Sequence, residues 1–443
     1  MATRTLTIEY VPVTSLRLNP ENPRLHSQKQ LRQLANSIRS FDFNVPVLVD
    51  AQLRVIAGHG RVLASKLVGL LEVPTIRLEH LSKHQIRAFT IADNRLAENA
   101  EWDNQLLGEQ LKILSEAEID FSLEATGFEM AEIDMMIEGL APASRGKDDP
   151  ADVIPDSGAR PEVTRADDLW VLDRHRVYCG DARDGAAYTA LMEGQRAEMV
   201  FADPPYNDPI DGYVTGFGKV HHREFAVASG EMSESEFTDF LTNVLALLAR
   251  NSADGALQFI FMDWRHMEEL MSAARSVYSE FKNLVVWVKE NAGQGSLYRS
   301  QHELVFVFKR GKKPHRNNIQ LGQFGRYRTN VWQYRRVNSL SRSADEGNLS
   351  VLHPTIKPVE LVADAILDCT ARGDIVLDAF LGSGTTVIAA ERTGRVCYGI
   401  ELDPRYVDTA VRRWQRFTGL EAVHQATGQT FTQREQEVEN ASQ

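Results

Sequence analysis

The feature that most constrains the fold of this chain is an alternation of short apolar runs with helical patterns after residue 165. The apolar runs include "HRVYCGD", "AEMVFAD", "ALQFIFMD", "DIVLDAF" and "RVCYGIELD", and one of the intervening helical patterns is "ESEFTDFLTNVLALLAR". Strands that alternate with helices are typical of a parallel sheet covered on both faces. We therefore predict an α/β fold with a doubly wound sheet.

The first part of the chain repeats this alternation on a smaller scale, which predicts a small α/β or α+β domain over residues 1 to 115. Residues 116 to 141 continue as a helical extension. Residues 142 to 163 are rich in Pro, Gly, Asp and Ser without an apolar period, which is typical of a linker. The larger domain then covers residues 164 to 418, and the Gln/Glu-rich residues 419 to 443 are expected to form a frayed polar tail.

Charge is unevenly distributed along the chain. The formal net charge is -12, yet no Asp or Glu occurs between Leu304 and Ala344. That window contains ten basic residues: Lys309, Arg310, Lys312, Lys313, Arg316, Arg326, Arg328, Arg335, Arg336 and Arg342. A solvated surface normally mixes both signs, so the window indicates a polyanion-binding segment.

Composition also limits where the protein works. The sequence has no apolar run of the roughly 18 residues that a membrane span requires, and "MATRTLTIEY" is not a secretory leader. The 3 cysteines are widely spaced and form no CxxC. We expect a cytoplasmic protein without a membrane partner, disulfides or a metal site.

A glycine turn follows one predicted strand in "DIVLDAFLGSGTTVIAAERTG". Gly382 and Gly384 permit a sharp turn and the close approach of a ligand, and Glu401 ends the next strand, where its carboxylate can accept hydrogen bonds from ribose hydroxyls. Val387 replaces the third glycine of a dinucleotide fingerprint, and no P-loop lysine follows. The turn therefore predicts an adenosine-containing cofactor without phosphates, S-adenosylmethionine.

The segment "ADPPYN" ends another strand. Prolines hold Asp203 and Pro204 rigid, so the Asp203 carboxylate and the Pro204 carbonyl can accept the two hydrogens of an exocyclic amine. Tyr206 offers a flat face for the attached ring, and Pro205 completes the catalytic set. A base in duplex DNA reaches such a pocket only after flipping out of the stack.

Together these motifs resemble the DNA amino-methyltransferases in which the catalytic motif precedes the cofactor loop. The resemblance covers residues 165 to 417 and includes "VYCGDARD", "ADPPYN", "HPTIKPVEL", "LDAFLGSGTT" and "YGIELDPRYV". It implies a Rossmann-like sheet and a target-recognition segment near residues 304 to 350. The implied cofactor residues are Asp181, His353, Thr355, Lys357, Asp378, Phe380, Gly382, Ser383, Gly384, Thr385 and Glu401. The implied contacts with double-stranded DNA are Lys312, Lys313, Arg316, Arg326, Arg328, Arg335 and Arg336.

The N-terminal domain resembles the ParB/sulfiredoxin superfamily through "NPRLHSQKQLRQLANSIRSFDFNVPVLVD" and "VIAGHGRVLASKLVGL". His59 stands in place of the sulfiredoxin cysteine, and only Arg61 remains of the ParB arginine pair. Redox chemistry is therefore not expected. Phosphate binding at Gly58, His59 and Arg61 stays open, and so do nucleotide binding, a DNA-docking role and homodimer assembly.

The resulting hypothesis is a DNA methyltransferase that transfers a methyl group from S-adenosylmethionine to an exocyclic amine, with adenine favoured over cytosine. Two alternatives remain at this point. One is a non-enzymatic, ParB-like DNA-binding protein, and the other is methylation of RNA.

Overall fold

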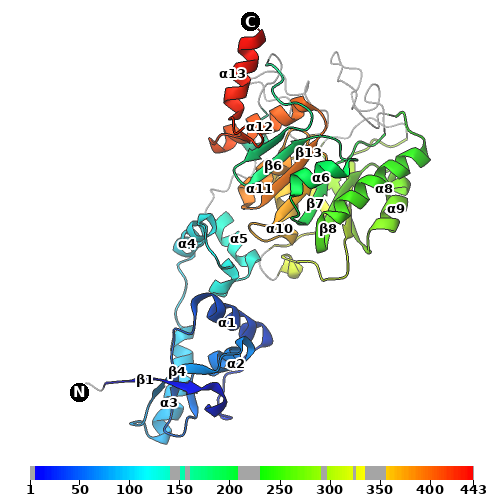
Figure 1. The fold of residues 1–443 in the computed structure, drawn as a ribbon. Coiled ribbons are helices and arrows are strands. Elements are labelled where there is room, and N and C mark those ends of the chain that lie inside the picture. The colour runs from blue at the N-terminus through cyan, green and yellow to red at the C-terminus, as the bar shows by residue number, and fades with distance from the viewer. Residues whose placement is uncertain are drawn as a thin grey trace. The chain divides into compact units, whose positions relative to one another are not determined.

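The computed structural model describes residues 5–139, 150–154, 160–207, 230–290, 297–322, 326–334 and 356–442. The chain divides into two compact units, residues 1 to 142 and residues 143 to 443. Figure 1 shows the elements of each unit. No helix in the described ranges is long and apolar enough to cross a membrane.

The first unit has a four-stranded sheet in the order β1-β4-β2-β3. Its strands are β1 (Ile8–Pro12), β2 (Val47–Val49), β3 (Val55–Ala57) and β4 (Glu72–Arg77). Its helices are α1 (Gln28–Phe41), α2 (His59–Val68), α3 (Lys83–Glu98), α4 (Asn104–Glu116) and α5 (Met130–Glu138). Val47, Val49, Val55, Val62 and Val73 form the centre of its core and are fully buried.

The second unit is built on a ten-stranded sheet in the order β11-β9-β10-β8-β7-β12-β13-β6-β5-β14. The strands are β5 (Leu169–Leu172), β6 (His175–Cys179), β7 (Ala197–Ala202), β8 (Ser252–Met262), β9 (Glu280–Val288), β10 (His302–Lys309), β11 (Val331–Gln333), β12 (Ile375–Asp378), β13 (Val396–Glu401) and β14 (Val423–His424). Strands β8, β7, β12, β13 and β6 run parallel, whereas β10 is antiparallel to both β8 and β9. The predicted doubly wound α/β fold is confirmed.

Helices cover both faces of this sheet (Figure 1). Helices α6 (Gly185–Met192), α8 (Glu234–Arg250) and α9 (Met267–Val277) contribute to one buried apolar cluster. Helices α10 (Val359–Cys369), α11 (Thr385–Thr393) and α12 (Pro404–Thr418) contribute to the other. Since each face is covered, the central strands read as continuous apolar runs, as the sequence shows.

Two segments that the sequence presents as irregular are folded. Strand β14 pairs with β5, and α13 (Phe431–Ser442) begins at a phenylalanine that is fully buried against Trp170. The expectation of a frayed tail was therefore wrong. Within the stretch expected to be a linker, Ala151, Ile154 and Val163 are buried. In this stretch three apolar residues are buried, but their spacing produces no period that the sequence would reveal.

Candidate active site

The two chemistry-bearing motifs meet at one edge of the large sheet. Asp203 follows β7, Asp378 ends β12, and Glu401 ends β13, and these three strands are parallel neighbours. Their carboxyl ends therefore lie side by side, which is where doubly wound sheets bind ligands. Asp203 and Glu401 both contribute to raising the pKa of Asp378, so the three carboxylates share one local field.

The side chain of Asp203 is fixed by two partners. The Tyr206 hydroxyl donates to Oδ1 at 2.8 Å, and the Lys357 ammonium lies 2.5 Å from Oδ2. Burial raises the pKa of Tyr206 well above 10, and the nearby Asp203 carboxylate raises it further, so the phenol remains a donor. The two prolines after Asp203 hold the backbone, as predicted from the sequence.

Asn207 closes this turn in a left-handed conformation, with φ 57°. Its Nδ2 donates to the Met232 carbonyl at 2.8 Å, and its Oδ1 accepts from the amides of Gly230 and Met232, both at 3.2 Å. The chain leaves the site at Asn207 and returns at Gly230, so one side chain joins both points.

The glycine turn has little room for any side chain. Gly382 and Gly384 have φ 53° and 82°, and a Cβ on Gly384 would lie 2.7 Å from Cβ of Ala410. Beneath the turn, the buried Arg413 donates to the Ser383 carbonyl at 3.2 Å and to Thr385 Oγ1 at 3.0 Å. Ser383 and Thr385 were predicted to contact the cofactor, but their side chains are buried and contact Arg413.

Glu401 and Asp378 are carboxylates in a poorly hydrated setting. Glu401 accepts hydrogen bonds from the amides of Gly382 at 2.8 Å and Asp403 at 2.9 Å. Asp378 accepts from Thr386 Oγ1 at 2.6 Å and from the Phe380 amide at 3.0 Å. Burial raises the pKa of each carboxyl to about 7 despite these bonds.

Clustered acidic groups suit a cation and repel phosphates. The arrangement of Asp203, Asp378 and Glu401 therefore fits a sulfonium cofactor that carries ribose but no phosphate. Asp181, after β6, remains a candidate for the adenine end. Its Oδ1 accepts from Arg183 Nε at 3.0 Å and its Oδ2 from Arg183 Nη2 at 2.6 Å, which makes a bidentate pair.

Lys357 contacts acidic side chains of the protein itself. Its ammonium contacts Asp203 and also Glu303 Oε2 at 3.1 Å, and its side chain is 7% exposed. It therefore has two carboxylate partners in the protein, whereas the resemblance implied a cofactor carboxylate. His353 and Thr355 lie outside the described residues.

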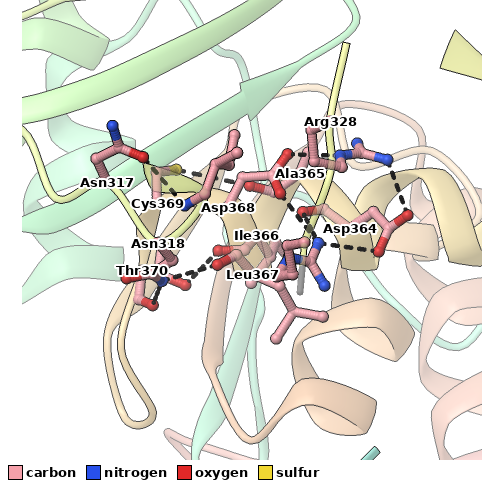
Figure 2. Close-up of polar contacts among 12 residues, drawn as sticks. Asn317, Asn318, Arg328, Asp364, Ala365, Ile366, Leu367, Asp368, Cys369 and Thr370 are labelled. Atoms are coloured by element: carbon pink, nitrogen blue, oxygen red, sulfur yellow. Dashed lines mark hydrogen bonds and ion pairs between the residues drawn. The ribbon is translucent and has the colours of Figure 1, made fainter. Parts of the chain in front are cut away.

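Two arginines of the acid-free window hold the segment to α10. Arg326 contacts Asp364 and Asp368 at 3.1 and 2.9 Å, and Arg328 contacts the same two carboxylates at 3.0 Å each. Figure 2 shows Arg328 turned toward these acids. Arg326 is 8% exposed, and the Arg328 side chain is 16% exposed. Acids distant in sequence neutralise both guanidinium groups in a buried network, and the DNA contacts expected of these two arginines stay a prediction.

The remaining basic residues of the window have a different environment. Lys312, Lys313 and Arg316 are exposed, and the amides of both lysines donate to Asp254 Oδ1 at 2.7 and 3.1 Å. These bonds fix the backbone and leave the ammonium groups outside that contact. Arg335 and Arg336 lie outside the described residues.

In the first unit, α2 begins at Gly58, which has φ 99°. His59 is buried, and its Nε2 accepts a hydrogen bond from the Asn19 amide at 3.3 Å. Burial lowers the pKa of His59, and nearby His26 lowers it further, so this ring is neutral and turned into the unit. Phosphate binding at the start of α2 stays a prediction, and the buried His59 ring would contribute to it only through its backbone. Arg61 Nε is buried and has no hydrogen-bond partner within the described parts of the chain.

Sequence reasoning missed Glu303, Asn207 and Arg413. Glu303 stands directly before the apolar run "LVFVF", and a single acid in an apolar strand is the signal that could have identified it. In the fold it is 8% exposed, which is unusual for a glutamate. Asn207 directly follows the catalytic motif. Arg413 lies in α12 among exposed-looking polar residues, so no local pattern distinguishes it.

Three features together define an amino-methyltransferase: a doubly wound sheet, a glycine turn that suits a nucleoside without phosphates, and the Asp203 carboxylate of the motif "DPPY". Comparison with known proteins identifies the class further. The DNA methylase family matches residues 197–412, the ParB-methyltransferase HTH domain matches residues 105–166, and the ParB N-terminal domain matches residues 2–95. In sequence order, the chain thus has two ParB-type domains followed by a DNA methylase domain. It is an S-adenosylmethionine-dependent DNA amino-methyltransferase.

Two named methyltransferases are similar in sequence to about half of this chain. Type II methyltransferase M2.MboI of Moraxella bovis is 26% identical over 258 residues, which is 55% of this chain and 88% of the relative. DNA adenine methyltransferase YhdJ of Escherichia coli (strain K12) is 26% identical over 264 residues, which is 52% of this chain and 80% of the relative. The structure of PvuII DNA methyltransferase (cytosine-N4-specific) aligns with TM-score 0.42 and 17% identity, over 60% of this chain and 93% of that one.

Proposed function

We propose that this chain methylates the exocyclic amine of adenine in double-stranded DNA, after the base has left the stack. The observation that carries the proposal is the position of the Asp203 carboxylate. It is fixed at the end of β7 by Tyr206 and Lys357, beside the carboxylates at the ends of β12 and β13.

The protein's own groups have separate tasks in this reaction. The amine of adenine is a poor nucleophile because its lone pair is delocalised into the ring. A carboxylate oxygen of Asp203 and the Pro204 carbonyl would accept its two hydrogens, which favours tetrahedral nitrogen and stabilises the positive charge that develops there. The ring of Tyr206 would support the base face, and the rigid turn would hold these groups in position.

When bound, S-adenosylmethionine supplies the methyl group. We propose that Glu401 accepts hydrogen bonds from its ribose, that Asp181 lies at its adenine, and that Asp378, Phe380, Gly382 and Gly384 line the methionine side. The acidic field of Asp203, Asp378 and Glu401 favours a positive sulfonium group.

The choice of adenine rests on two supports. The proline motif begins with Asp203, and one of the named relatives is a DNA adenine methyltransferase. Cytosine N4 remains the second candidate base, since the same acceptors can bind its amine.

The test is transfer of labelled methyl to unmethylated duplex DNA, followed by digestion and mass analysis of the nucleosides. Labelled N6-methyladenine is expected. Replacing Asp203 with Asn should lower the transfer rate by about 10²-fold or more while cofactor affinity changes little. Near-normal transfer by this variant would show that the carboxylate is not the acceptor.

For the first unit we propose an anion-binding role for the start of α2, with a nucleotide as the ligand. The buried Arg61 Nε beside Gly58 supports it. Calorimetric titration with nucleoside triphosphates should show binding that the Arg61→Ala variant loses.

We also propose a homodimer, because edge strand β1 exposes Ile8 (54%) and Tyr10 (69%). Light scattering of wild-type and Tyr10→Asp proteins tests the homodimer.

The proposed location is the cytoplasm, where DNA is accessible and the three buried cysteines can remain free.

A further inference from the structure

A row of alternating charges runs through the catalytic region. Lys289 lies 2.5 Å from Glu303 Oε1, Glu303 Oε2 lies 3.1 Å from Lys357, and Lys357 lies 2.5 Å from Asp203. The side chains of Glu303 and Lys357 are 9% and 7% exposed. Two cations and two anions thus balance in a largely desolvated setting.

This row is anchored in rigid elements. Glu303 lies in β10 and pairs with Trp287 of β9, and Lys289 directly follows β9, its amide bound to the Gln301 carbonyl at 2.9 Å. Lys357 precedes α10, whose first amide, at Val359, donates to Asp152 Oδ1 at 2.8 Å. Because each end is held by backbone structure, the ammonium of Lys357 has little freedom to leave Asp203.

We propose that Lys357, held in place by Glu303, is a positioning residue that orients the Asp203 carboxylate toward the base amine and keeps it ionised during methyl transfer. The proposal rests on the function proposed above for Asp203. It assigns to Lys357 a role on the catalytic carboxylate rather than on the cofactor.

Three neighbouring side chains affect the ionisation of Asp203. Burial raises the pKa of this carboxyl, Glu303 adds to the rise, and Lys357 and the Tyr206 hydroxyl oppose it. Asp378 of β12 faces the same region and adds further negative charge. Without Lys357, Asp203 would keep only the tyrosine hydroxyl against these effects. Its protonated form cannot accept two hydrogen bonds at the same geometry, so activity would need a higher pH.

Burial opposes the charge on Lys357 itself, but Asp203 and Glu303 outweigh burial and raise its pKa. Glu303 is in turn kept ionised by the two lysines that contact it. Its own pKa is lowered to about 2: burial would raise it, but Lys357 and Lys289 more than compensate. Glu303 therefore stays ionised and keeps Lys357 protonated over the working pH range.

The experiment uses the full chain and measures single-turnover methyl transfer from pH 6 to 9, together with cofactor dissociation constants from equilibrium dialysis. For Lys357→Met we expect the rate at pH 7 to fall at least about tenfold and the acid limb to move up by about one pH unit. Cofactor affinity should change by less than about threefold. Lys357→Arg should restore part of the rate. A rise in the cofactor dissociation constant that matches the fall in rate would overturn the proposal, and so would an unshifted acid limb.

Glu303→Gln is the second variant. It removes the carboxylate that supports Lys357 but leaves the ion pair between Lys357 and Asp203 in place. It should lower the rate less than Lys357→Met does, and should have no further effect in the Lys357→Met background. Independent, additive effects would contradict the assignment. Thermal unfolding of each variant identifies any loss of folding, and Lys357→Arg keeps the test valid if the methionine variant unfolds. Asp203→Asn distinguishes the two hypotheses: if it is active, the proposed function fails, whereas an inactive Asp203→Asn with a normal Lys357→Met overturns only this inference.

Discussion

Gly384 faces Ala410 so closely that a Cβ on the glycine would lie 2.7 Å from the alanine Cβ and 3.0 Å from its Cα. Helix α12 thus packs directly on the cofactor turn. Gly384→Ala should lower the free energy of unfolding by about 2 to 4 kcal/mol, because it combines overpacking with a left-handed φ of 82°. Cofactor binding should be lost with it.

Gly373 is the matched control for that change. Its φ is 81°, yet nothing lies within 4 Å of a Cβ placed there. Gly373→Ala should therefore cost only the backbone strain, about 1 to 2 kcal/mol. Denaturant unfolding compares the two variants, and equal losses would show that the contact with Ala410 is unimportant.

Cofactor binding should strengthen as pH rises through about 7. Burial raises the pKa of Asp378 and Glu401 to about 7, so both are partly protonated at neutral pH. A cation binds better to the ionised forms, so the dissociation constant should fall between pH 6 and 8 and level off above that. Calorimetry at several pH values measures this. Glu401→Gln should weaken binding and reduce its pH dependence.

The same two groups affect stability with a defined sign. Their folded pKa values lie above the unfolded ones, so folding favours the protonated forms. Their stabilising contribution is present below about pH 4 and is lost as pH rises through about 7. Because the cofactor offsets the loss, it should raise Tm more at pH 8 than at pH 6. An equal shift at both values would contradict this assignment.

Asn207 should be sensitive to substitution for two separable reasons. Asn207→Ala removes three hydrogen bonds. It also places alanine, which disfavours the left-handed region, at φ 57°. Together these effects should lower the free energy of unfolding by about 2 kcal/mol. Asn207→Gly removes the same bonds but tolerates the conformation, so it should cost less. The free energies of unfolding of the two variants measure the difference.

Arg328 and Lys313 should behave differently although both lie in the acid-free window. Arg328→Met leaves Asp364 and Asp368 without one partner and should destabilise the chain by about 3 to 5 kcal/mol. Lys313→Met should leave Tm unchanged, weaken DNA binding and reduce its salt dependence by about one phosphate contact. Binding isotherms at several salt concentrations test this. A stable Arg328→Met protein with weak DNA binding would support the DNA contact predicted for Arg328.

The sheet could be predicted from sequence because each central strand is a short apolar run bounded by polar turns. Helix α8 matches the predicted segment from Glu234 to Arg250, where a serine cap and a continuous apolar face define both ends. Strand β14 has only two residues, so no periodicity could reveal it.

For the site, the motif residues could be placed at the strand ends, but their partners could not. The pairing of Arg326 with Asp368 joins residues 42 apart, and that of Lys357 with Asp203 joins residues 154 apart. A count of charges in a window does not include acids that fold onto it from elsewhere. The acid-free window was therefore an incomplete guide to which arginines are available to DNA.

The short segment around Asp152 determines how small an active fragment can be. The Ala151 carbonyl accepts from Arg413 at 2.8 Å, and Asp152 binds the first amide of α10, two residues beyond Lys357. A truncation that starts at residue 164, where composition predicts the start of the methyltransferase domain, would remove both contacts. A fragment that keeps both contacts therefore has to begin before residue 150, so it retains the last part of the segment that matches the ParB-methyltransferase HTH domain, residues 105–166.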